Sequence, residues 1–133
     1  MKLHRGLGRV GGGALVAAVA AVAVMASPAF AKSDITLSVT PHVVKTGQQV
    51  HVLAAGGDDG MQNERLCLDI RTGHGSWHTA RCISDYLGAG GPLSGTYRMQ
   101  HRGTESFRAQ LLVQHGRAYH VELTSATVVI SVR

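Results

Sequence analysis

Histidines are frequent in this chain, and all but one of its eight histidines follow residue 31. His74 and His78 flank a Gly-containing turn closely enough for both imidazoles to bind one metal ion. A zinc or copper site needs a third ligand and usually a fourth. No second H-x-H, no C-x-x-C and no acidic residue at ligand spacing accompanies the pair. We therefore predict no tight metal site and no cofactor, with His74 and His78 as weak candidate ligands.

Asp58 and Asp59, in the segment GGDDG, offer the oxygen ligands that calcium takes on a flexible loop. Two adjacent carboxylates without a further acidic residue nearby are too few for such a site. We expect a charged turn here.

Enzyme motifs are also missing. Ser94 lies in GPLSGT, which lacks the G-x-S-x-G spacing of a nucleophile elbow. No pair of carboxylates stands out for acid–base work, and a triad built from distant residues stays open at this point. We predict no catalytic residues and no enzymatic activity.

Cys67 and Cys82 are the two cysteines of the chain. An even count in an exported protein indicates a disulfide. If 66–72 and 77–83 form a hairpin with Thr72 opposite Trp77, Cys67 falls directly opposite Cys82. Opposed strand residues have Cα atoms about 4.5–5.5 Å apart, within the roughly 4.4–6.8 Å that a disulfide accepts. The bridge would then lie on the polar face of the hairpin.

The same register makes predictions for the apolar face of this hairpin. It pairs Leu66 with Ile83 and Ile70 with Thr79, and it puts Trp77 and the awkward Arg81 on that face. A lone Trp beside a turn can be a recognition residue, but we expect Trp77 to fill the core.

Residues 1–31 have the pattern of a secretory signal peptide. Lys2, Arg5 and Arg9 precede an apolar run over 14–26, which is shorter than the roughly 20 residues of a transmembrane helix. Ala29-Phe30-Ala31 then fits the small-residue cleavage site. We predict cleavage between Ala31 and Lys32, a secreted domain over residues 32–133, and no membrane attachment after cleavage.

Cleavage changes the charge of the protein. Loss of three basic residues takes the count of Lys and Arg from 13 to 10 against 8 acidic residues, a net charge of +2 with neutral histidines. Such a near-neutral domain lacks the dense basic surface of a nucleic-acid-binding protein. We expect no nucleic-acid partner.

Alternation of apolar and polar residues recurs along the predicted mature chain, which is typical of half-buried antiparallel strands. No segment after residue 31 has helical periodicity, and residues 115–124 fit either a hairpin turned at His115-Gly116 or a loop. With a shorter strand near 77–83, about seven strands are expected. The alternating segments are 35–40, 50–54, 66–71, 97–101, 107–114 and 126–132.

The segments ITLSVTPHVVKTGQQVHVLA, ESFRAQLLV and TSATVVISV resemble the first two and last two strands of bacterial immunoglobulin-like domains. This resemblance implies an all-β, immunoglobulin-like antiparallel sandwich that acts as an adhesion, spacer or ligand-binding module. TLSVTP and the two nearby cysteines also show a weaker resemblance to secreted apoproteins of the neocarzinostatin type, which hold an apolar chromophore in a cleft. Those proteins usually carry two disulfides, whereas this chain can form one.

The function predicted from these observations is a secreted, non-enzymatic immunoglobulin-like module that binds a protein, a glycan or a surface outside the cell. The alternative is a small-ligand or metal carrier that uses a cleft of the sandwich or its His-rich loops.

Overall fold

The computed structural model describes residues 33–60, 62–85 and 92–133. The predicted signal peptide and its cleavage site at Ala31–Lys32 lie outside these residues. Within them every regular element is a strand, and no helix capable of crossing a membrane is found. The strands are β1 (Ser33–Thr40), β2 (Val43–Val44), β3 (Gln49–Asp58), β4 (Glu64–Thr72), β5 (His78–Asp85), β6 (Leu93–Arg98), β7 (Gly103–His115), β8 (Ala118–Thr124) and β9 (Val128–Val132).

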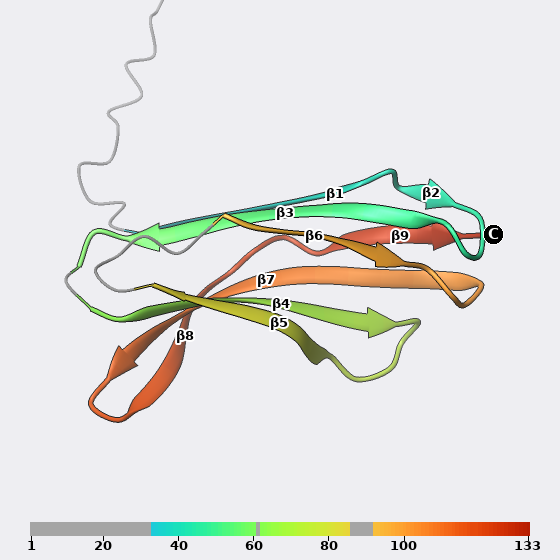
Figure 1. Ribbon diagram of the computed structural model, residues 1–133. Coiled ribbons are helices and arrows are strands. Elements are labelled where there is room, and N and C mark those ends of the chain that lie inside the picture. Colours follow the sequence, from blue (N-terminus) through green and yellow to red (C-terminus); the bar gives the residue numbers. More distant parts are fainter. Residues whose placement is uncertain (1–32, 61, 86–91) are drawn as a thin grey trace, which may run out of the picture.

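These strands form the two layers of a sandwich (Figure 1). One sheet has the order β1-β3-β6 and the other the order β2-β9-β7-β4-β5, with β8 also paired to β7. The pairings are antiparallel except that of β2 with β9. The predicted all-β sandwich is therefore confirmed, and β2 and β8 are the strands that the sequence pattern did not separate.

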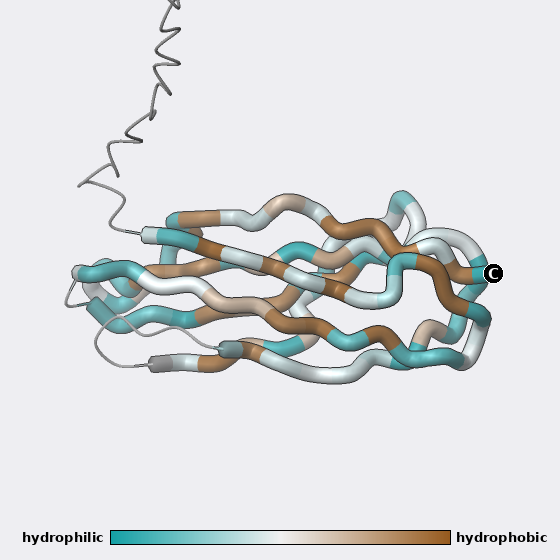
Figure 2. The backbone as a smooth tube through the Cα atoms, turned by 90° about the horizontal axis from the view of Figure 1, so that it is seen from above, coloured by the Kyte–Doolittle hydropathy of each residue, from teal (hydrophilic) through white to brown (hydrophobic). Residues whose placement is uncertain are grey.

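The core is built largely from the alternating rows predicted from the sequence, but β6 starts upstream of the expected segment 97–101, so Leu93 is buried and His101 is exposed. Because neighbouring side chains of a strand point to opposite faces, one row of each strand meets the other sheet. Figure 2 shows the resulting alternation of hydrophobic and pale segments along the strands. Burial of each large aliphatic side chain contributes about 1.5–3 kcal/mol. The largest fully buried apolar side chains are Phe107, Leu66, Leu68, Leu93, Leu111, Ile130, Val39, Val50 and Val113.

The long strand β7 belongs to two pairings on the same edge. Its first part pairs with β9 and its last part with β8, while β4 runs along the opposite edge. The β7–β8 hairpin turns away from the two layers (Figure 1). The open interpretation of 115–124 is thus resolved as a hairpin, with His115 paired to Ala118 around Gly116 and Arg117. Gly116 has a φ of 65°, a conformation that glycine adopts without steric cost.

The β4–β5 hairpin has the predicted register at one end and a different register at the other. Cys67 pairs with Cys82 and Leu66 with Ile83, as expected. A β-bulge between Leu68 and Asp69 then shifts the partners, so Ile70 lies opposite His78 and not opposite Thr79. The predicted pairing of Ile70 was wrong because the sequence argument assumed a hairpin without a bulge.

This bulge also corrects the prediction for Trp77. A shift of one residue moves side chains to the other face of a strand. Thr79 therefore meets Asp69 on the outer face of the sheet, and Trp77 stacks there on Arg71 and Arg108 instead of filling the core.

Arg81 precedes the shift and keeps the inward side opposite Leu68. Its exposed side chain is accommodated because β5 is an edge strand. The Arg81 guanidinium crosses to the other sheet, where Nη1 donates to the Ser94 carbonyl oxygen at 2.6 Å.

Candidate functional site

A cluster of aromatic and charged side chains covers the outer face of β4 and β7 near the start of β5. The Trp77 ring centroid lies 4.5 Å from the Arg71 guanidinium carbon and 4.3 Å from that of Arg108. Cation–π contacts at such distances contribute about 0.5–2 kcal/mol each. We call Asp69, Arg71, Trp77, Thr79 and Arg108 the Arg–Trp cluster.

Asp69 holds this cluster together by accepting two side-chain hydrogen bonds. Arg108 Nε donates to its Oδ2 at 3.0 Å, and the Thr79 hydroxyl donates to its Oδ1 at 3.0 Å. Asp69 is only 4% exposed, so its charge has to be matched by donors at close range. Arg71 Nε, in contrast, is buried with no hydrogen-bond partner among the described residues. With two arginines and one aspartate, the cluster carries one more positive than negative charge. Its hydrogen bonds and ring contacts hold these side chains in place.

The disulfide continues the same outer row of β4. Arg65, Cys67, Asp69 and Arg71 alternate with the core residues of the strand. Cys67 and Cys82 are bridged with Cα atoms 4.1 Å apart, a little closer than the sequence argument assumed. Cys67 is only 5% exposed but lies outside the hydrophobic core cluster, as expected for a bridge on the polar face of the hairpin. Farther along the row, Arg65 stacks 4.1 Å from the Tyr119 ring centroid.

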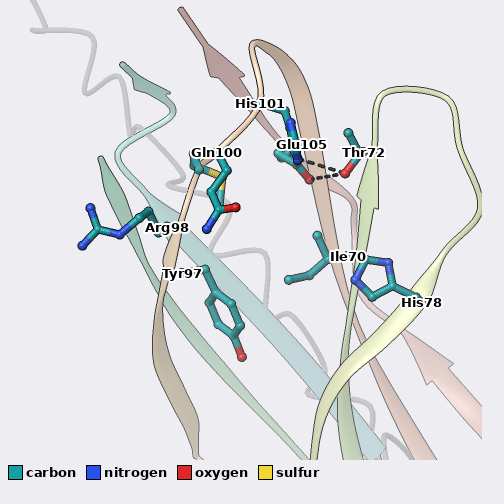
Figure 3. A pocket seen from close by; sticks show the side chains of 9 residues that line it. Ile70, Thr72, His78, Tyr97, Arg98, Gln100, His101 and Glu105 are labelled. Carbon is teal, nitrogen blue, oxygen red and sulfur yellow. Dashed lines mark hydrogen bonds between the residues drawn. The ribbon is translucent and has the colours of Figure 1, made fainter. Parts of the chain in front are cut away.

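A cleft opens between the β6 end of one sheet and the ends of β4, β5 and β7 in the other (Figure 3). Its volume is about 180 Å³. Glu105 lines it while being only 6% exposed. The Thr72 hydroxyl lies 3.0 and 3.2 Å from the two carboxylate oxygens of Glu105. The lining side chains are Ile70, Thr72, His78, Tyr97, Arg98, Met99, Gln100, His101 and Glu105.

Glu105 is the residue that the sequence analysis missed. It stands two residues before Phe107, so it continues the inward row of β7 with a carboxylate in place of an apolar side chain. Glu64 does the same on β4, where it is fully buried two residues before Leu66. A carboxylate that extends an apolar row at period two is the signal that identifies both residues.

The acidic turn predicted at Asp58 has neighbours that are remote in sequence. Partial desolvation raises the pKa of Glu122, although its side chain is exposed, and a hydrogen bond and repulsion from Asp58 raise it further, with a smaller contribution from Glu64. Asp58 itself accepts a hydrogen bond from the Gly60 amide at 2.7 Å. The statement that no other acidic residue lies nearby was thus wrong in space, because β8 brings Glu122 to the end of β3.

Of the two candidate metal ligands, His78 lines the cleft and His74 does not. His74 lies in the turn between β4 and β5, whereas His78 begins β5 and lines the cleft. In the described ranges no group of three His, Cys, Asp or Glu side chains is arranged to hold a metal ion. A different pair is close: the rings of His115 and His120 lie 5.6 Å apart across the β7–β8 hairpin.

No protein-family model matches this chain, and no curated protein matches it. Among solved structures, it is similar to the CARDB domain of a Pyrococcus furiosus protein in complex with di-metal ions. That match has a TM-score of 0.52 and 15% identity, and it covers 77% of this chain and 96% of that domain.

Two further matches are to parts of larger chains. One is an alkylpurine DNA glycosylase of Pseudomonas fluorescens bound to DNA, with a TM-score of 0.50, 17% identity and coverage of 77% of this chain and 30% of that one. The other is a β-glucosidase of Erythrobacter marinus, with a TM-score of 0.52, 9% identity and coverage of 76% and 15%. At such identities the likeness shows the fold alone, and that fold is an immunoglobulin-like β-sandwich.

Proposed function

We propose that this protein is a secreted, non-enzymatic immunoglobulin-like module that binds a protein or a glycan outside the cell. The Arg–Trp cluster is the observation that carries this proposal. Trp, Tyr and Arg are the residue types that dominate binding energy at interfaces. Side chains already held in one conformation also lose less entropy when a partner binds.

The outer face of β4 and β7 has two such anchors on one row. Trp77 lies on Arg71 and Arg108 at one end, and Tyr119 lies under Arg65 at the other. The disulfide between these ends holds β4 against β5. We assign the binding surface to this face, and the low net charge of the predicted mature domain gives no reason to propose a nucleic-acid or membrane partner.

Secretion is supported by the signal-peptide pattern and by the disulfide, since such bonds persist in oxidising compartments. Intact-mass analysis of protein recovered from the culture medium should show a chain that begins at Lys32. Recovery of the protein only in membranes, with residues 1–31 retained, would contradict this part of the proposal.

A small-ligand carrier is the second candidate, because the cleft contains the buried carboxylate of Glu105. The metal-carrier version has no comparable support, since among the described residues no group of three His, Cys, Asp or Glu side chains is arranged to hold a metal ion.

The binding proposal is tested with the exported protein immobilised against proteins and glycans of its own extracellular medium. Trp77→Ala should weaken a captured partner's affinity roughly 30-fold, the effect of losing a hot-spot residue of about 2 kcal/mol. Leu53→Ala is the control, because Leu53 is a large apolar side chain that is more exposed than Trp77 and lies on the outer face of the other sheet. A partner that binds Trp77→Ala as tightly as the unaltered protein would disprove this assignment.

A further inference from the structure

The cleft holds a carboxylate whose charge the described residues leave unmatched. Thr72 is the one hydrogen-bond donor that they supply to Glu105, although a carboxylate can accept about four hydrogen bonds. None of their Lys, Arg or His nitrogens lies within ion-pairing distance of it. A buried carboxylate is costly unless a cation or several donors compensate it. A cation that matches this charge would have to come from outside the described residues.

The basic side chains of the cleft do not fill this role. Arg98 Nη1 donates to the Gly47 carbonyl oxygen at 2.6 Å, and Figure 3 shows the Arg98 side chain directed away from Glu105. His78 and His101 are exposed residues at the edge of the cleft. Neither forms an ion pair with Glu105.

The remaining walls suit an apolar stem. Ile70 and Met99 are buried side chains that line the cleft. The Tyr97 ring stands beside them, and its edge-on contact with Phe107, at 6.2 Å between centroids, holds it in place. The volume of about 180 Å³ is below the roughly 300–1,000 Å³ of pockets for drug-sized ligands. The cleft therefore has room for one side chain or a small molecule.

We propose that the cleft between β6 and the ends of β4, β5 and β7 binds a small organic cation, an ammonium or guanidinium group on a short apolar stem. The cationic group pairs with the Glu105 carboxylate, and the stem packs on Ile70, Tyr97 and Met99. A partner's Lys or Arg side chain and a free alkylamine share this chemistry. The site is separate from the Arg–Trp cluster, so it can be tested independently of the proposed function.

Two probes of nearly equal size test the charge on the unaltered protein. In a ¹H–¹⁵N NMR titration of the purified protein, n-butylammonium should shift the amide signals of residues 72, 78, 97–101 and 105. Neutral n-butanol should bind at least roughly tenfold more weakly, since a hydrogen-bonded charge contributes about 1.5–3 kcal/mol. This comparison does not depend on whether any variant folds.

Glu105→Gln provides the second test, because the amide oxygen can still accept from Thr72 while the charge is lost. Butylammonium affinity should fall roughly tenfold or more, whereas butanol binding should stay within about twofold. Asp34→Asn is the matched control, since it removes the charge of an exposed carboxylate on β1 that does not line the cleft. It should leave both affinities unchanged.

A third arm distinguishes the sources of the cation. Nα-acetyl-lysine N-methylamide that binds as well as butylammonium points to a partner's side chain, and exclusion of this blocked lysine points to a free amine. Both results require loss of binding in Glu105→Gln. Equal affinity for amine and alcohol, unchanged amine binding by Glu105→Gln, or signal shifts confined to other regions would each overturn the proposal.

Discussion

Two buried carboxylates lie on opposite faces of the same sheet and differ in their hydrogen-bond and ion-pair partners. Asp69 on the outer face is 4% exposed and accepts from Arg108 and Thr79. Glu105 on the inner face is 6% exposed and accepts from Thr72 alone among the described residues. Burial is nearly the same, so the difference lies in the partners.

This difference separates a structural charge from one that is free to act on a ligand. Asp69 holds together side chains of β4, β5 and β7, and its removal leaves the Arg108 guanidinium without a counter-charge. Glu105 holds only the Thr72 hydroxyl in place, and its removal leaves no described cation uncompensated. Stability measurements should therefore respond strongly to changes around Asp69 and weakly to changes at Glu105.

The largest expected effect comes from opening the hairpin that supports Asp69. Cys67→Ala combined with Cys82→Ala should lower the free energy of unfolding by about 3 kcal/mol, the chain-entropy estimate for a loop of this size. Urea denaturation of the double variant under non-reducing conditions measures it.

Non-reducing peptide mapping provides the control for this experiment. It should recover one peptide pair joined through Cys67 and Cys82. Two free thiols, or a dimer linked through either residue, would contradict the bridge and remove the basis of the prediction.

Asp69→Asn should have the next largest effect, a loss of about 2–3 kcal/mol. Breaking a fully buried ion pair costs about 3–5 kcal/mol, but the Arg108 side chain is 27% exposed and recovers part of that by hydration. Chemical denaturation of the variant gives the value. A loss below about 1 kcal/mol would show that the outer face does not depend on this charge.

Glu105→Gln should change stability by less than about 1 kcal/mol in the absence of any cation, and in the stabilising direction. The amide keeps the hydrogen bond from Thr72 and removes the cost of a buried charge. The same denaturation series as for Asp69→Asn measures both variants side by side. Equal destabilisation by the two variants would break the comparison.

The smallest effect is expected for Glu122, a carboxyl on β8 with a raised pKa. A raised pKa in the folded state means that folding favours the protonated form. That contribution is complete below the usual value of 4.5 and is lost as the pH rises through the raised pKa. Glu122→Gln should therefore raise Tm slightly at pH 7 and leave it unchanged at pH 4. An equal shift in Tm at both pH values would contradict the raised pKa of Glu122.

The features that could be predicted from the sequence are those that follow from the alternation of apolar and polar residues along a strand. The inward rows of β3, β4, β7 and β9 follow from period two, because a strand with one buried face must repeat its apolar residues in this way. The pairing of Cys67 with Cys82 followed from the same geometry. These features are local, or they need only one assumption about how two neighbouring strands meet.

The features that could not be predicted from the sequence depend on the β-bulge and on contacts between residues that are far apart in the chain. No residue near Leu68 marks the bulge, so Ile70 and Trp77 were assigned the wrong partners. Glu122 approaches Asp58 only because β8 folds back along β7. The cleft around Glu105 needs the ends of two different sheets, which no pattern along a single strand contains.

The bulge in the β4–β5 hairpin consists of one extra residue in β5, so deleting that residue changes the hairpin in a way that no substitution does. Ala80 is the residue that the shifted register leaves without a partner in β4. A chain shortened by this one residue has a hairpin of uniform register, with Cys67 still facing the same cysteine. Thr79 still faces Asp69 and His78 still faces Ile70, so Trp77 stays on the outer face opposite Arg71. A homologous chain with a hairpin shorter by this one residue is therefore compatible with the same outer surface, provided that it keeps the aromatic residue before β5.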